Sequence, residues 1–138
     1  MTIDIRYTED GLGVELLASG AVTGADIMDA LRTIYGDDRF NDIKYLIADK
    51  TACTDYRVTT RDVMAIASLD NAASQENPDL IEVHVTPTGD ARNMSVMWQA
   101  FTERGRSRSQ IFRDRKNADA WVAKQLSSAS VINKSSSA

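Results

Sequence analysis

Polar side chains that could bind a ligand or a partner follow two apolar segments of this chain. Both segments, residues 45–48 and 80–86, lead into such side chains. Ligands of open α/β sheets usually bind beyond the carboxyl ends of parallel strands, so two neighbouring strands would gather these side chains at one rim. The predicted rim contains Asp49, Thr51, Cys53, Thr86 and Asp90. Helix N-termini near Thr60 and Ala91 would add backbone N–H donors for an anion.

Thr59 and Thr60 carry hydroxyl groups at the predicted start of a helix, beside the same rim. A hydroxyl at this place accepts a hydrogen bond from a free backbone N–H group, and Asp62 in the first turn favours the positive helix terminus. We therefore interpret the two threonines mainly as capping residues. A phosphate added to either one would change the charge of a docking surface.

Cys53 and His84 are the only cysteine and the only histidine, and they could form a nucleophile–base pair. No orienting third residue or oxyanion-hole motif accompanies them. One histidine, one cysteine and scattered acids also lack the spacing of a metal site. We therefore expect no catalytic centre, no metal and no cofactor. An enzyme that uses Asp49, Cys53 and His84 is the third hypothesis.

Four large side chains follow helical spacing in the segment after residue 90. They are Met94, Met97, Trp98 and Phe101. They could line a pocket for a small apolar ligand, because methionine side chains adapt to irregular shapes. Helical stripes of this kind normally pack on a sheet, so a role in the core is the favoured interpretation.

Composition fits one globular domain of 138 residues, with 43% hydrophobic and 26% charged residues. No signal peptide and no membrane-spanning run is recognisable, so we expect a cytoplasmic protein without membrane insertion. The net charge is −4, but residues 91–138 are basic. This segment fits phosphate or an acidic partner or, the favoured interpretation, a solvated sheet edge. It lacks interleaved aromatic residues for base stacking, which argues against nucleic acid.

Apolar patterns predict five strands. They lie at residues 3–7, 14–18, 45–48, 80–86 and 106–112. The first two should form an antiparallel hairpin that ends at Gly20, because only a short turn-rich segment joins them. The third lacks alternation, which is typical of an interior strand covered on both faces. In the fourth, Glu82 and His84 should bond to each other on the solvent side.

Capping signals predict four helices between and after these strands. Their starts lie at Thr23, at Thr59 or Thr60, near Ala91 and at Asp114. Residues 50–58 are polar and predict a loop. The order of elements predicts a single-domain α/β layer fold over residues 1–126, in which an N-terminal hairpin and β-α units form a mixed five-stranded sheet. Residues 127–138 are rich in serine and predict a disordered tail.

This order resembles the SpoIIAA-like proteins of the STAS superfamily, which includes anti-sigma-factor antagonists. The resemblance covers roughly residues 1–126 and is carried by residues 20–24, 45–49 and 112–114, with Ala118, Ala120 and Trp121. It implies a STAS-like fold and a regulatory role. Antagonists of this superfamily carry a phosphorylatable serine in an Asp-Ser-Ser-Gly-like stretch after the central strand. Residues 49–60 lack that motif, so the phosphoswitch is not carried over.

Two hypotheses for the function therefore stand above the enzyme. The first is a non-enzymatic regulatory or interaction module that docks to a protein partner or to a second copy of itself. The second is a carrier or sensor of a small apolar or amphipathic ligand held beneath the helix of residues 94–101.

Overall fold

A computed structural model describes residues 3–87, 89–102 and 108–136, with side chains of the last helix described as far as residue 128. Five strands form one mixed sheet in the order β1-β2-β3-β4-β5. β1 and β2 pair antiparallel, as predicted for the hairpin, and the other neighbours pair in parallel. The strands are β1 (Ile3–Tyr7), β2 (Gly13–Thr23), β3 (Tyr45–Arg57), β4 (Ile81–Val85) and β5 (Ser109–Phe112).

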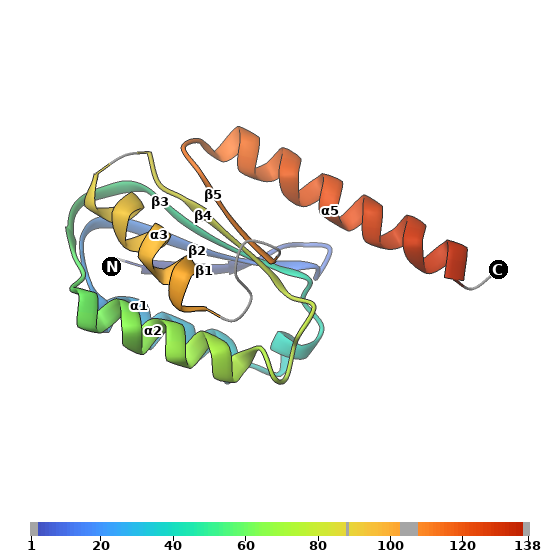
Figure 1. The fold of residues 1–138 in the computed structure, drawn as a ribbon, viewed down its shortest axis with the longest axis horizontal. Helices are drawn as coiled ribbons and strands as arrows, with labels where there is room; N and C mark the ends of the chain where they lie inside the picture. Colours follow the sequence, from blue (N-terminus) through green and yellow to red (C-terminus); the bar gives the residue numbers. More distant parts are fainter. Residues whose placement is uncertain (1–2, 88, 103–107, 137–138) are drawn as a thin grey trace.

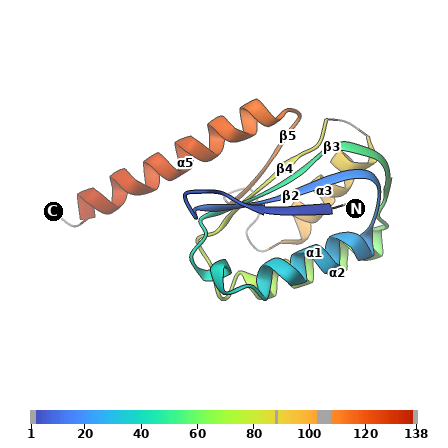
Figure 2. The same cartoon turned by 180° about the vertical axis from the view of Figure 1, so that it is seen from behind.

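Helices cover the two faces of this sheet unequally (Figures 1 and 2). On one face lie α1 (Gly24–Tyr35), α2 (Thr60–Ala73) and α3 (Asp90–Phe101), and on the other lies α5 (Arg115–Ser136). A 3-10 turn, η1 (Asp38–Asn41), precedes β3. The predicted α/β layer fold with a mixed five-stranded sheet and four α-helices is confirmed for the described residues.

Two helices begin where their capping signals predicted. Thr23 caps α1 and bonds reciprocally with Asp26, so that each side chain accepts from the backbone N–H of the other residue. Thr59 and Asp62 form the same capping box at the start of α2. These local bonds satisfy helix-end N–H groups and set the positions at which both helices start.

The second and third strands are longer than predicted. Gly20 does not end β2, because it adopts a φ of 66° within a register shift and the strand continues to Thr23. β3 likewise runs through the predicted loop of residues 50–58 as far as Arg57, paired in parallel with β2. The loop prediction was wrong because pairing with a long neighbour, and not apolar content, extends this strand.

All five residues of β4 are buried. Helices on both faces of the sheet cover this strand, so Glu82 and His84 lie inside the protein with 1% and 7% of their surfaces exposed. The prediction that Glu82 and His84 lie on a solvent-exposed side of this strand was therefore wrong. A strand covered on both faces has no solvent side, and its polar residues need partners in the core.

α5 packs on β4 and β5 through its first turns. Ala118 and Val122 are buried there, and Trp121 and Leu126 are partly buried. The helix then continues to Ser136, which differs from the predicted disordered tail; no glycine or proline after residue 126 interrupts it. In the predicted strand 106–112, residues 106 and 107 lie outside the described residues. No described helix is long and apolar enough to cross a membrane.

Candidate functional site

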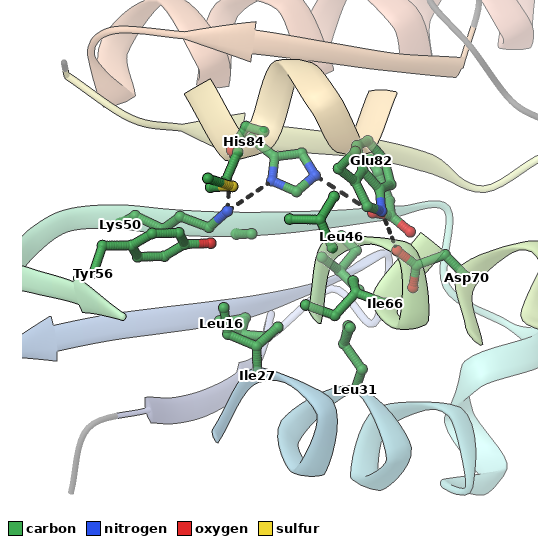
Figure 3. Close-up of a pocket in the computed structure, with 15 residues that line it drawn as sticks. Leu16, Ile27, Leu31, Leu46, Lys50, Tyr56, Ile66, Asp70, Glu82 and His84 are labelled. Carbon is green, nitrogen blue, oxygen red and sulfur yellow. Dashed lines mark hydrogen bonds and ion pairs between the residues drawn. The ribbon is translucent and has the colours of Figure 1, made fainter. Parts of the chain in front are cut away.

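A cavity of about 30 Å³ lies between the sheet and helices α1, α2 and α3. Much of its wall is apolar, with Leu16 and Leu46 on the sheet and Ile66 on α2. Lys50 and His84 bring polar atoms to the same wall (Figure 3). Ionisable side chains inside an apolar cavity mark a candidate functional site, because burial changes their protonation.

Lys50 on β3 is buried, with 6% of its surface exposed. Its Nζ atom lies 3.1 Å from Ser95 Oγ, 3.3 Å from His84 Nδ1 and 5.3 Å from the centre of the Tyr56 ring. Burial lowers the pKa of Lys50 to about 8, and nearby acidic groups partly oppose this shift. The ammonium form therefore predominates at pH 7 and gives way to the amine above about pH 8.

His84 lies on β4 between Lys50 and Glu82. Its ring centre is 4.4 Å from that of Trp98, and its Nε2 atom is 3.6 Å from Glu82 Oε2, just beyond hydrogen-bond length. Burial lowers the pKa of His84, and the charge of Lys50 lowers it further, whereas Glu82 raises it. The neutral ring accepts from Lys50 at Nδ1, which assigns the ring proton to Nε2, on the side of Glu82.

A second polar group joins three helices to the sheet beyond His84. Tyr35 on α1 donates its hydroxyl to Asp70 on α2, and the same hydroxyl lies 3.4 Å from Glu82 Oε1. Trp98 on α3 donates its Nε1–H to Asp70 Oδ2 over 2.6 Å. The buried carboxylate of Asp70 therefore accepts from two donors, and the cluster ties α1, α2 and α3 together at the wall of the cavity.

Asp49 faces the opposite side of the sheet from this cavity. Its Oδ1 atom accepts from the backbone and hydroxyl of Thr51 over 3.0 and 2.7 Å, and its Oδ2 atom is 3.2 Å from Arg115 Nη1. Arg115 also binds Glu15 and Asp119. Asp49 thus helps to fasten the start of α5 to the sheet.

The other rim residues lie in different surroundings. Cys53 is half-buried on β3, and burial raises the pKa of its thiol. Thr86 is fully buried, and its Oγ1 atom has no hydrogen bond within the described residues. Asp90 is exposed at the start of α3, and Thr60 is exposed next to the cap Thr59. The structure brings Asp49 and Thr51 together but spreads the remaining rim residues over separate places.

The helical stripe of α3 is divided between core, cavity and surface. Trp98 is buried and lines the cavity together with the partly buried Met94. Met97 packs against the main core, whereas Phe101 is 45% exposed. The favoured core role therefore holds for part of the stripe, and only Met94 and Trp98 border the space in which a ligand could bind.

Beyond their first turns, α2 and α3 carry exposed apolar side chains on their outer face and no exposed charged side chain among the described residues. Met64 is 55% exposed and Val96 is 47% exposed. A surface hollow of about 380 Å³ lies between the two helices, lined by Met64, Ala67, Ser68, Asn71 and Phe101. Residues 63–73 contain one charged side chain, the buried Asp70, and residues 93–102 contain none. We call this surface the α2–α3 face.

Sequence reasoning missed both Lys50 and the α2–α3 face. The alternation of a strand continued past residue 48 would have placed Lys50 on the same side as Leu46 and Ala48. The scarcity of charged residues in segments 63–73 and 93–102 was also visible in the sequence. Their significance depends on which helix faces are exposed, and that follows only from the packing.

Comparison with known proteins identified no relative of this chain. Searches of protein-family models, curated proteins and solved structures found no match. The described residues also contain no group of three His, Cys, Asp or Glu side chains that could hold a metal ion. The resemblance to SpoIIAA-like proteins therefore stays a prediction that rests on the order of elements and on the local motifs.

Proposed function

We propose that this protein is a non-enzymatic regulatory module that docks a partner protein on the α2–α3 face. The observation that carries this proposal is the exposure of Met64 and Phe101 beside the hollow between α2 and α3, whose lining contains no charged side chain among the described residues. Exposed apolar surface that is continuous over neighbouring elements marks an interaction site in soluble proteins. Exposed methionine suits such a site because its side chain adapts to the shape of a partner.

The outer face of α1 provides an internal comparison. Its exposed residues Asp29 and Arg32 form an ion pair over 3.6 Å, which is the usual composition of a solvated helix face. In residues 63–73 and 93–102, by contrast, the described structure has no exposed charged side chain, although 26% of the chain is charged. The resemblance to SpoIIAA-like proteins, which implies a regulatory role, supports the same proposal.

The proposal is tested by placing a charge on the face. Met64→Glu and Phe101→Glu should weaken binding of the partner at least tenfold, because a buried unpaired carboxylate opposes association. Tagged wild type and variants are purified from host cells, co-purifying proteins are quantified, and the mass in solution is measured by light scattering. Leu12→Glu is the matched control, since Leu12 is 36% exposed on the turn between β1 and β2.

Two outcomes separate the possible partners. If the partner is a second copy of the chain, the wild type should be a dimer in solution and Met64→Glu should be a monomer. If neither the co-purifying proteins nor the mass in solution depends on Met64 or Phe101, docking on this face is wrong.

A carrier or sensor of a small ligand is the second candidate, and the cavity beside Lys50 favours it. The volume of about 30 Å³ matches roughly two water molecules, so a long apolar chain would require α3 to move outward. The enzyme hypothesis has the least support, because Asp49 and His84 face opposite sides of the sheet.

A further inference from the structure

The cavity contains a buried ammonium group whose contacts carry no negative charge. Lys50 Nζ bonds to the hydroxyl of Ser95 and to the neutral ring of His84. The carboxylates of Asp70 and Glu82 line the same cavity and act on Lys50 through their charge, while their own hydrogen bonds come from Tyr35 and Trp98. A buried charge is costly without an anion in contact with it, so this position favours an anionic ligand at neutral pH.

The size and the wall of the cavity restrict the ligand. A volume of about 30 Å³ corresponds to roughly two water molecules, which is close to the size of formate or acetate. Leu46, Ile66 and Met94 form apolar wall that suits a hydrogen or methyl substituent but not a second charge. A compact monovalent anion with a short apolar end therefore fits better than phosphate or a dicarboxylate.

We propose that the cavity beside Lys50 binds a small monocarboxylate of the size of formate or acetate. One carboxylate oxygen takes the Lys50 ammonium as its ion-pair partner, and the apolar end lies toward Leu46 and Ile66. This site lies under the helices and not on the α2–α3 face. The proposal therefore does not depend on the proposed docking function.

Trp98 provides a direct readout, because its ring packs on His84 beside the ligand position. The chain has two tryptophans, so Trp121→Phe leaves Trp98 as the fluorophore. Titration of this variant with sodium formate or sodium acetate at pH 7 should give a saturable change in fluorescence. Sodium chloride at equal ionic strength should give none.

Lys50→Met tests the ion pair in the same background, because methionine keeps most of the side-chain volume without the charge. It should weaken carboxylate binding at least tenfold. Lys44→Met, which removes an exposed lysine, should leave binding unchanged. Circular dichroism and a thermal melt check that Lys50→Met is folded.

Raising the pH should also release the ligand. With a pKa of about 8, the ammonium fraction of Lys50 falls about 30-fold between pH 7 and pH 9.5, and affinity should fall with it. The other titratable groups around Lys50 are Tyr35, Cys53, Tyr56, Asp70, Glu82 and His84. Cys53→Ser controls for the thiol, whose charge acts on Lys50.

Three results would each overturn the proposal. They are the absence of a saturable signal with formate and acetate, equal affinity for chloride, and undiminished affinity in folded Lys50→Met. None of these results bears on Met64 or Phe101, so the docking function would be judged separately.

Discussion

Lys50 is the residue whose surroundings differ most from those its type usually occupies. Lysine is rarely buried, yet here 6% of its surface is exposed and its Nζ atom contacts Ser95 and His84. Burial lowers the pKa of its ammonium group because the charged form loses hydration. Protonation of this one group therefore couples the stability of the core to pH.

The direction of this coupling is a prediction at the residue scale. The pKa of Lys50 is about 8 in the folded state and near 10.5 when unfolded, so the unfolded chain binds more protons between these values. Stability of the wild type should rise from pH 8 to pH 10.5, by roughly 3 kcal/mol relative to Lys50→Met. Urea denaturation of both proteins across this range measures the difference, and parallel curves would mean that Lys50 is hydrated.

At the scale of single elements, short-range capping sets where α1 and α2 begin. Each helix starts with a threonine whose hydroxyl and partner aspartate exchange backbone bonds. The cap at Thr59 also fixes the start of α2, and Met64 is an exposed residue of that helix. The cap therefore contributes to the position of the proposed docking face.

Thr59→Ala should destabilise the protein by about 1 kcal/mol, because it leaves the Asp62 N–H without its side-chain acceptor. Thr60→Ala is the matched control, since Thr60 is the exposed neighbouring threonine and gives the helix no cap bond. Its stability should change by less than about 0.5 kcal/mol. Chemical denaturation measures both, and equal effects would mean that the capping box is not formed in solution.

Over the whole molecule, the two faces of the sheet have different roles. Three helices enclose the cavity and the polar cluster on one face, and α5 closes the other with a smaller apolar contact. Arg115 fastens α5 through its bonds to Glu15 and Asp49. Beyond Leu126 the helix extends away from the sheet (Figure 1).

Truncation after Leu126 should leave the melting temperature nearly unchanged, because the apolar contacts of α5 with the sheet that the structure describes come from Ala118, Trp121, Val122 and Leu126. A helix that extends without a packed face contributes little to stability. Thermal melts of the full chain and the truncated protein test this. A drop of several degrees would show that residues 127–138 stabilise the fold.

The fold class followed from the sequence because its signals are local. The threonine–aspartate caps, the hairpin and the alternation of strands with helices all depend on residues within a few positions of one another. The stripe of Met94, Met97, Trp98 and Phe101, for which a core role was favoured, includes two residues that line the cavity, Met94 and Trp98. These features predicted the layers and part of the candidate site.

Tertiary packing alone decided the rest. The pairing of β2 with β3 carried Lys50 into the core, and cover on both faces of β4 buried Glu82 and His84. The same packing left Met64 exposed and set Asp49 against Arg115. Burial depends on which elements lie above and below a residue, and distant parts of the chain supply those elements. Its chemical consequences therefore followed from the folded structure and not from the local pattern.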